Sequence, residues 1–425
     1  AVRLETSVDC PEDITNFLLR HFALTKDDVY QVNGPVNLNR LMAIYDLLDR
    51  PDLKYAPFTP RIPKRVVAKE DIFAVMRESD LLLHHPFESF APVIDLLRQA
   101  ATDPDVLAIK QTLYRTGPQS PVVDALVDAA RAGKEVTVII ELMARFDEAA
   151  NISLATRLQE AGAHVMYGVV GYKTHAKLIM VVRRERGKLR RYCHLGTGNY
   201  HPNTARTYTD YGLFTCDEAV GEDLHELFLQ LTSPTRVATM QKILQSPFTL
   251  HDALLEKTKR EMEVARQGRP ARIIAKLNAL IEPQIIQTLY QASMAGVKID
   301  LIVRGICALR PGIPGVSENI RVRSIIGRFL EHSRVYYFHN DGDPELFCAS
   351  ADWMERNFFR RIEVCFPLGR SHRDQIIEDL QIYLSDNVQA WELRADGEYE
   401  HCSAGDKAMI SAQTMLLRRY TETND

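Results

Sequence analysis

Two short segments far apart in the chain repeat one pattern, and this repeat limits the folds that the chain can adopt. In each, a histidine is followed by a cation two residues later, an apolar strand and a turn of small residues. The copies begin at His175-Ala-Lys177 and His332-Ser-Arg334, and their turns are residues 195–200 and 348–353. Side chains two residues apart lie on one face of a strand, so each histidine shares a face with its cation. Two such units predict one site at the junction of two similar domains.

The residues ahead of the two copies repeat as well. Ala132-Gly-Lys-Glu-Val-Thr-Val-Ile-Ile in the first copy matches Ala295-Gly-Val-Lys-Ile-Asp-Leu-Ile-Val in the second. In both, a glycine ends a helix and a strand follows. Any two α/β units share that pattern. It does not explain why a His-x-cation strand follows the glycine at a similar distance along the chain in both copies. The duplication predicts two domains about a pseudo-two-fold axis with a central cleft.

Composition narrows the class of protein. A length of 425 residues is enough for two or three domains with their own cores. The net charge of −4 gives no overall attraction to nucleic acid, so we expect no nucleic-acid partner and only a local anion-binding surface. The sequence has no apolar run of membrane-span length, no signal peptide and no Cys-x-x-Cys pair among its seven cysteines. These features predict a cytoplasmic protein with reduced thiols, and leave peripheral contact with the inner membrane open.

Three regions are expected along the chain. Residues 1–65 are typical of the end of a helical domain followed by a linker, because four prolines between positions 51 and 63 resist helix. The chain starts within this helical pattern, which predicts a piece of a longer protein. Residues 66–245 and 246–425 each alternate strands with helices, which favours an α/β domain around a largely parallel sheet. The fold class is therefore α/β, with two duplicated domains after a short helical segment.

His175 is the candidate nucleophile. Imidazole titrates near ~6.5, so much of it is a free base at neutral pH, and its attack on phosphorus gives a phosphohistidine. Lys177 beside it would neutralise phosphoryl oxygens as charge shifts in the transition state. Most histidines in a chain are structural, but the context of His175 favours a functional role.

His332 is the natural partner of His175. Phosphoryl transfer needs a proton donor or a stabilising group on the opposite face, and Arg334 with Arg328 would add bidentate contacts to phosphate. A buried histidine bonded to a carbonyl is the alternative for His332, and it stays open.

Three arginines follow strands directly: Arg115, Arg145 and Arg304. Ligands of a parallel sheet gather beyond the carboxyl ends of its strands, so all three point to the expected cleft. Each alone would be an ordinary surface ion-pair partner, but their equivalent positions predict an anion site.

Three further features have both a functional and a structural interpretation. The turn that ends at Asn199 could hold phosphate on its backbone amides, or simply be a turn. Tyr208 and Tyr211 could stack on a base or merely pack. The basic run 183–191 could guide a polyanion or form a solvated hairpin tip.

At this point the sequence resembles the polyphosphate kinases of the first type, bacterial enzymes whose catalytic half belongs to the phospholipase D structural superfamily. The resemblance covers essentially the whole chain. It rests on residues 109–116, 141–148, 172–177, 194–200 and 231–234, and on the second copy around Arg304 and His332. The family has an amino-terminal domain and a helical domain ahead of this region, and the chain is expected to begin late in the helical one.

The resemblance implies a reaction and a set of roles. The γ-phosphate of ATP would move reversibly onto a growing inorganic polyphosphate chain through a phosphohistidine on His175. His332 matches a second essential histidine beside the nucleotide, and Tyr208 and Arg304 match positions that contact the nucleotide. The expected phosphate or magnesium–phosphate site comprises Arg115, Arg145, Lys177, Asn199 and Arg334. Because arginine has no acceptor atom, Arg115 and Arg145 would hold phosphate oxygens that Mg²⁺ also touches, rather than the ion itself.

The family also implies partners, and the sequence leaves alternatives. The expected partners are ATP or ADP, inorganic polyphosphate, Mg²⁺ and further copies of the chain in a dimer or tetramer. Polymer length, direction and nucleotide preference stay open. A phospholipase D-like phosphodiesterase or phosphatidyl transferase is the alternative, and a non-catalytic polyanion-binding module is a third class. Hydrolytic members of the superfamily carry an acidic residue soon after the lysine, and the apolar strands after Lys177 and Arg334 lack it. The kinase is therefore favoured, and the group that orients His175 must come from elsewhere in the fold.

Overall fold

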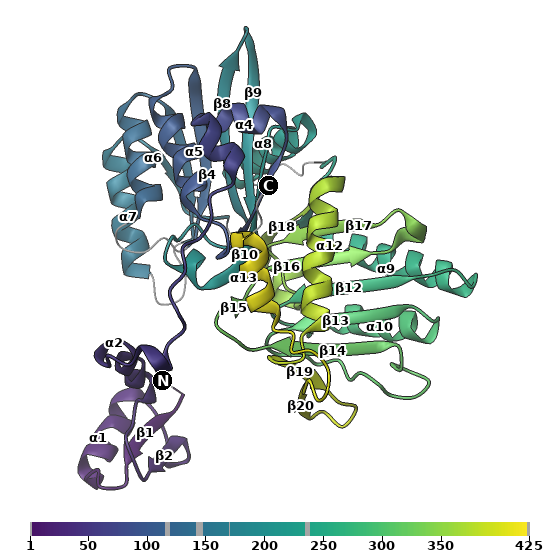
Figure 1. The fold of residues 1–425 in the computed structure, drawn as a ribbon. Helices are drawn as coiled ribbons and strands as arrows, with labels where there is room; N and C mark the ends of the chain where they lie inside the picture. The colour runs from purple at the N-terminus through teal and green to yellow at the C-terminus, as the bar shows by residue number, and fades with distance from the viewer. Residues whose placement is uncertain (1, 115–119, 142–147, 170, 234–238, 423–425) are drawn as a thin grey trace. The chain divides into compact units, whose positions relative to one another are not determined.

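The computed structural model describes residues 2–114, 120–141, 148–169, 171–233 and 239–422. The chain divides into two compact units, residues 1–58 and residues 59–425 (Figure 1). The second unit contains both copies of the repeat.

The first unit combines short helices with a two-stranded sheet. Strand β1 (Leu4–Ser7) pairs in parallel with β2 (Val29–Val32). Its helices and 3-10 turns are α1 (Glu12–Phe22), η1 (Lys26–Asp28), η2 (Leu38–Ala43), α2 (Ile44–Leu47) and η3 (Pro51–Leu53). The sequence predicted the helices but not the strands. Two parallel strands need a crossover connection, and α1 supplies it. Each strand has only four residues, which is too short for a recognisable alternation in the sequence.

The second unit begins with the half that contains His175. Its helices are α3 (Lys64–Lys69), α4 (Ile72–Glu78), α5 (Ala91–Thr102), α6 (Pro121–Arg131), α7 (Glu148–Glu160), the 3-10 turn η4 (Thr204–Arg206) and α8 (Glu218–Thr232). Its strands are β3 (Leu81–His85), β4 (Val106–Leu113), β5 (Glu135–Ile140), β6 (His164–Met166), β7 (Lys173–Thr174), β8 (Lys177–Glu185), β9 (Lys188–Gly196) and β10 (Tyr208–Thr215).

The half that contains His332 follows. Its helices are α9 (Leu250–Arg266), α10 (Pro283–Met294), the 3-10 turn η5 (Asn340–Gly342), α11 (Glu355–Phe359), α12 (Arg370–Ser385) and α13 (Ala412–Glu422). Its strands are β11 (Leu244–Ser246), β12 (Arg272–Leu277), β13 (Lys298–Val303), β14 (Ile320–Ile325), β15 (Leu330–Glu331), β16 (Arg334–Phe338), β17 (Glu345–Ala349), β18 (Arg361–Pro367), β19 (Ala390–Leu393) and β20 (Tyr399–His401).

The two halves repeat one sheet topology, so the duplicated α/β fold expected from the sequence is confirmed. In the first sheet β4, β5 and β6 run parallel, and β8, β9 and β10 continue it antiparallel on the other side of β4. In the second sheet β12, β13 and β14 match the parallel strands, and β16, β17 and β18 match the antiparallel ones. Helices α5, α6 and α7 lie on one side of the first sheet in Figure 1.

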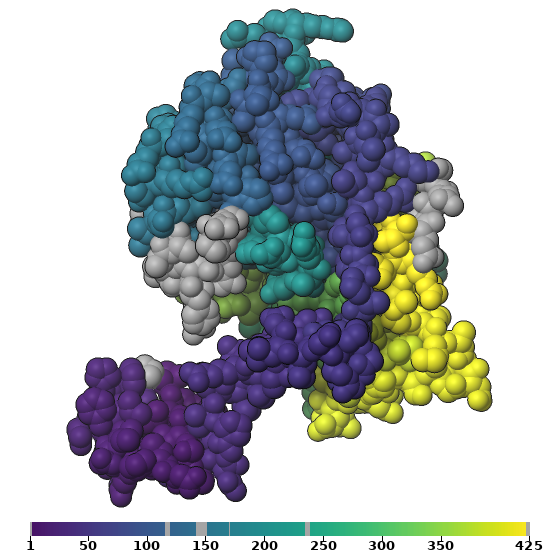
Figure 2. Space-filling model, turned by 60° about the vertical axis from the view of Figure 1, so that its left-hand side comes forward, coloured from purple at the N-terminus to yellow at the C-terminus, as the bar shows by residue number. Residues whose placement is uncertain are grey.

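The prediction of a largely parallel sheet is wrong, because both sheets are mixed. The hairpin between β8 and β9 shows the reason. Its two central residues, Arg186 and Gly187, have φ angles of 48° and 78°. Two consecutive residues with positive φ form the tight turn whose twist matches antiparallel strands, so β9 folds back directly along β8. The hairpin tip projects from the molecule at the top of Figure 2.

The two halves also exchange short strands. Strand β7 pairs in parallel with β18, and β15 pairs in parallel with β10. Each of these two-residue strands ends one residue before a histidine of the repeat, so His175 and His332 lie between strands rather than within one. Figure 1 shows β10, β15, β16 and β18 grouped where the halves meet. Each histidine is therefore held against a strand of the opposite half.

Two further observations concern the described part of the chain. No helix there is both long enough and apolar enough to cross a membrane. All seven cysteines are free thiols.

Candidate active site

Strand β18 fixes both the backbone and the ring of His175. The backbone N–H of His175 donates to the carbonyl oxygen of Ile362 at 2.9 Å. The ring Nδ1 lies 2.9 Å from Oε2 of Glu363, a fully buried carboxyl group to which the Ser350 hydroxyl also donates. With Nδ1–H directed at the carboxylate, the free electron pair of the ring is on Nε2. The ring of His175 is thereby held by its Nδ1, and its role as a nucleophile stays a prediction.

Strand β10 holds His332 in the same way. Nδ1 of His332 lies 2.9 Å from both oxygens of Asp210, and its backbone N–H donates to the Thr209 hydroxyl at 3.1 Å. The Thr197 hydroxyl donates to Asp210 at 2.6 Å, as the Ser350 hydroxyl does to Glu363. The two histidine–carboxylate pairs are therefore related by the pseudo-two-fold repeat.

Neither carboxylate was identified from the sequence. The segment around His175 contains no group that could orient the ring, and that group comes from the opposite half of the unit. One signal was present: Asp210 and Glu363 are the only acidic residues of β10 and β18, two largely buried strands. A carboxyl group is almost never fully buried unless it is paired, so such an acid indicates a partner.

The two cations of the repeat are buried at the same place. Lys177 is 2% exposed, and its amine donates to the carbonyl oxygen of His175. Arg334 is 4% exposed and makes a two-point contact with Asp352, with Nε and Nη2 at 3.2 and 3.0 Å from its oxygens. Nη1 of Arg334 lies 3.2 Å from Nε2 of His332. Both cations thus contact the histidine of their own copy.

Electrostatics indicates that the two copies form one site. Burial lowers the pKa of His175 well below its usual value, and the charges of Lys177, Arg361, Arg334 and His332 lower it further. Three of those groups, Arg361, Arg334 and His332, belong to the half that contains His332. Since such effects need proximity within a buried site, the two histidines lie close together.

Burial and neighbouring charges shift the pKa values of the groups around the two histidines. Burial raises the pKa of Glu363 to about 7 and lowers that of Lys177 to about 7. Burial also acts to raise the pKa of Asp210, but the charge of His332 and hydrogen bonds from His332 and Thr197 outweigh it, so this pKa is lowered. Asp210 is therefore ionised at neutral pH. Burial lowers the pKa of His332 as well, although the charge of Asp210 opposes this effect, and it lowers the pKa of His175 well below its usual value.

Tyr208 and Arg304 lie near His332. The ring centroid of Tyr208 is 5.3 Å from that of His332. Burial lowers the pKa of Arg304, the charge of Arg334 lowers it further, and Asp352 and Tyr208 oppose this effect. Tyr208 thus lies beside the second histidine, and Arg304 lies near Arg334 and Tyr208.

The turn that ends at Asn199 packs against the carboxylate of Asp210. A Cβ atom at Gly198 would lie 2.1 Å from Oδ2 of Asp210, so only glycine fits there. Asn199 lines a small pocket with Gly198 and Asp210, and its Oδ1 has no hydrogen-bond partner among the described residues. The expected phosphate contact through this turn stays a prediction.

We expect Gly198→Ala to lower kcat about 10- to 100-fold, because the added methyl group displaces Asp210 and so misplaces His332. Gly369→Ala is the matched control, since a Cβ atom there would meet no atom within 4 Å. Steady-state kinetics of both variants check the effect. Equal activity of the two variants would contradict a positioning role for Asp210.

Two expected site residues, Arg115 and Arg145, lie outside the described residues. Within the described ranges, no group of three or more His, Cys, Asp or Glu side chains is arranged to hold a metal ion.

The two repeated sheets and their paired histidines define a duplicated α/β protein. The phosphatidylserine synthase of Haemophilus influenzae Rd KW20 matches with a TM-score of 0.52 over 81% of this chain and 93% of its own. At 10% identity this likeness shows the fold alone.

Closer matches give the family. The family models described as polyphosphate kinase C-terminal domain 1, C-terminal domain 2 and middle domain match residues 71–237, 243–413 and 1–44. The polyphosphate kinase of Xylella fastidiosa (strain 9a5c) is 59% identical over 420 residues, which are 98% of this chain and 60% of the relative. The crystal structure of polyphosphate kinase from Porphyromonas gingivalis matches with a TM-score of 0.89 at 32% identity, over 99% of this chain and 65% of that one. The chain belongs to the polyphosphate kinase family, and it spans about 60% of the length of the curated relatives that it matches.

Proposed function

We propose that the chain transfers the γ-phosphate of ATP reversibly to inorganic polyphosphate through a phosphohistidine on His175. The observation that carries this proposal is a buried, neutral imidazole whose Nδ1 faces Glu363 and whose Nε2 is free to react. Membership of the polyphosphate kinase family and the convergence of two cation-flanked histidines support it.

The reaction has two in-line steps. Nε2 of His175 attacks the γ-phosphorus, an N–P bond forms, and the bond from phosphorus to the β–γ bridging oxygen breaks with its electron pair leaving on ADP. A terminal oxygen of polyphosphate then attacks the same phosphorus, and the N–P bond breaks with its electron pair returning to Nε2. Each step moves negative charge onto oxygens, so fixed cations lower its barrier.

We assign the stabilisation of that negative charge mainly to residues of the second copy. His332, whose Nδ1 faces ionised Asp210, donates a proton to the bridging oxygen or stabilises it as it leaves. Arg334 and Lys177 hold the oxygens of the transferring group, and Asn199 adds a polar contact. Tyr208 and Arg304 contact the nucleotide, supported by their places beside His332 and Arg334.

We propose that Mg²⁺ reaches this site on the phosphates of the nucleotide, as part of the substrate. The described residues supply no carboxylate cluster for a resident ion. In the bound nucleotide the ion would neutralise phosphate oxygens, and Arg115 and Arg145 would contact those same oxygens.

The remaining features are proposals for the protein in its cell. The seven free thiols support a cytoplasmic location. Family membership supports a homo-oligomer, either a dimer or a tetramer, which light scattering after gel filtration would measure. The boundaries at residues 65/66 and 245/246 stay a prediction.

The decisive experiment incubates the protein with Mg²⁺ and ATP labelled at the γ-phosphate. We expect acid-labile, base-stable label on the protein that passes to added polyphosphate. Absence of label together with cleavage of a phosphatidyl lipid or phosphodiester would replace the proposal with the phosphodiesterase alternative. Absence of both would favour a binding module.

The pH dependence of kcat/KM provides a separate check of Lys177. Its pKa of about 7 predicts that kcat/KM falls as pH rises through about 7, because the ammonium group is lost. The charge of Glu363 raises this pKa, so Glu363→Gln should move the falling limb to lower pH. Glu398→Gln, which changes an exposed residue, should leave the limb in place. A limb that stays in place or moves upward in Glu363→Gln would contradict this role.

A further inference from the structure

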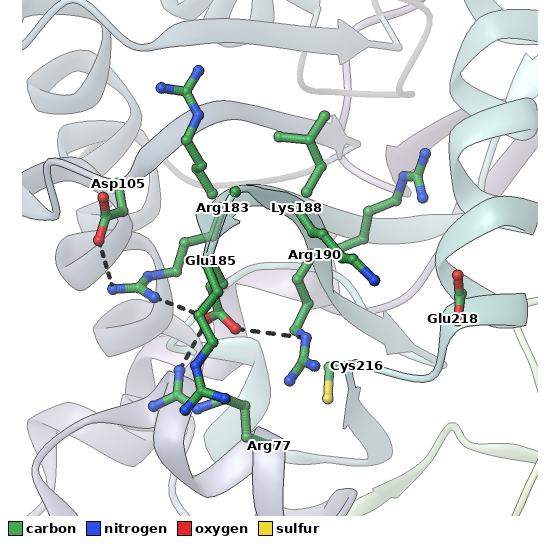
Figure 3. Close-up of a pocket in the computed structure, with 13 residues that line it drawn as sticks. Arg77, Asp105, Arg183, Glu185, Lys188, Arg190, Cys216 and Glu218 are labelled. Atoms are coloured by element: carbon green, nitrogen blue, oxygen red, sulfur yellow. Dashed lines mark hydrogen bonds and ion pairs between the residues drawn. The ribbon is translucent and has the colours of Figure 1, made fainter.

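The hairpin of β8 and β9 forms a strongly basic surface outside the histidine site. Its cations are Arg183, Arg184, Arg186, Lys188, Arg190 and Arg191, and with Arg77 of α4 they line an open hollow (Figure 3). The acidic residues of the hollow are Asp105, Glu185 and Glu218. In a chain whose net charge is −4, this local excess of positive charge calls for a physical explanation. We call these cations the hairpin surface.

Two nearby carboxylates, Glu185 and Glu222, already pair with part of the hairpin surface. Glu185 accepts hydrogen bonds from Arg77 at 3.1 Å and from Arg183 at 2.9 Å, and lies 3.6 Å from Arg190. Arg191 pairs with Glu222 at 2.7 Å.

Three exposed cations remain at the tip: Arg184, Arg186 and Lys188. Among the described residues, none of their side chains lies within ion-pair distance of a carboxylate. They are free to bind an external anion.

The position of the hairpin separates it from the histidine site. Strand β8 begins at Lys177, beside His175, and ends at Glu185. At about 3.3 Å per residue, the tip lies roughly 26 Å along the strand from Lys177. A ligand that reaches from the histidines to the tip must be a long one.

The residues that line the hollow indicate which kind of polyanion would bind there. Exposed lysines and arginines on two strands make many weak, screened contacts, which add up only on a ligand with many charges. Proteins that bind single-stranded nucleic acid combine such cations with aromatic side chains on which bases stack. The lining of this hollow contains arginines, a lysine, acids, Leu189, Gly187 and Cys216 but no aromatic residue. A polyanion made of phosphates alone fits this surface better than RNA or single-stranded DNA.

We infer that the hairpin surface binds a distal stretch of a long inorganic polyphosphate chain whose end is at the histidine site. This inference rests on the proposed function and adds a second contact region for the same substrate. A long chain would contact both regions and bind more tightly, whereas tripolyphosphate would contact only one of them.

The test is a triple variant that removes the three free cations, Arg184→Gln with Arg186→Gln and Lys188→Gln. A matched control removes three exposed cations elsewhere in the unit, Arg131→Gln with Lys259→Gln and Lys407→Gln. We expect the hairpin variant to bind long-chain polyphosphate about 10-fold more weakly and with a smaller salt dependence, because fewer phosphates are neutralised. Its affinity for tripolyphosphate and its label on His175 should match those of the control.

Other outcomes distinguish this inference from the proposed function. Equal long-chain affinity in the two triple variants would overturn the inference, even if His175 is labelled. Weaker binding of an RNA oligonucleotide with unchanged polyphosphate binding would overturn it in favour of nucleic acid. Weaker long-chain binding without label on His175 in any variant would support the hairpin surface and reject the phosphohistidine.

Discussion

Replacing His175 with alanine is expected to lower kcat for phosphoryl transfer by about 10⁴-fold or more and to abolish the acid-labile label. The side chain supplies the attacking Nε2, while its Nδ1 faces the carboxylate of Glu363. Loss of a nucleophile that works as a unit with its neighbours costs about as much as loss of the unit. Labelling with γ-labelled ATP and steady-state kinetics measure the two effects.

Two variants serve as controls for His175→Ala. His164→Ala changes an exposed histidine of β6 and should keep both activity and label. His332→Ala should lower kcat strongly, because the group beside the leaving oxygen is lost, while some label on His175 persists at long times. Persistent label in His175→Ala together with its loss in His332→Ala would exchange the two roles across the pseudo-two-fold axis.

The sequence was informative where neighbouring residues in the chain are also neighbours in the site. His175 and Lys177 are two residues apart, as are His332 and Arg334, so their pairing could be recognised directly. The alternation of strands and helices likewise predicted β4, α6, β5 and their counterparts β12, α10 and β13. Local sequence was sufficient for these features because each depends on one short segment.

Features that join distant segments could not be predicted in this way. Glu363 meets His175 only because β7 pairs with β18, and Asp210 meets His332 only because β15 pairs with β10. Two-residue strands are too short to show the alternation of apolar and polar residues that is typical of a strand, so no sequence pattern predicted these pairings. The acids were visible only as charges within apolar strands.

This reciprocal arrangement has a mechanistic consequence. Each histidine belongs to one half, and the carboxylate that orients it belongs to the other. Neither histidine is therefore held correctly unless the two halves are packed together. Correct docking of the halves is thus a condition for a competent site.

Arg334 tests this dependence with the largest expected effect on stability. Its guanidinium is buried against Asp352 and also donates to the carbonyl oxygen of Thr197 in the other half, at 3.3 Å. Arg334→Met would leave the buried charge of Asp352 without a partner, which costs about 3–5 kcal/mol of the free energy of unfolding. Urea denaturation monitored by tryptophan fluorescence, with Trp353 next to Asp352 in the sequence, measures this loss.

The double variant Arg334→Met with Asp352→Asn separates stability from catalysis. Asparagine can still accept the hydrogen bond that the Asn278 backbone N–H gives to Asp352 at 2.7 Å, and no unpaired charge is buried. We therefore expect most of the lost stability to return, while phosphoryl transfer stays impaired because no cation lies beside Nε2 of His332. The folded-state pKa of Asp352 is depressed, mainly by Arg334 acting against burial, so the wild-type advantage over Arg334→Met should be present above the ordinary carboxyl pKa and shrink as pH falls. Recovery of activity together with stability in the double variant would mean that Arg334 only supports the fold and takes no part in holding phosphate.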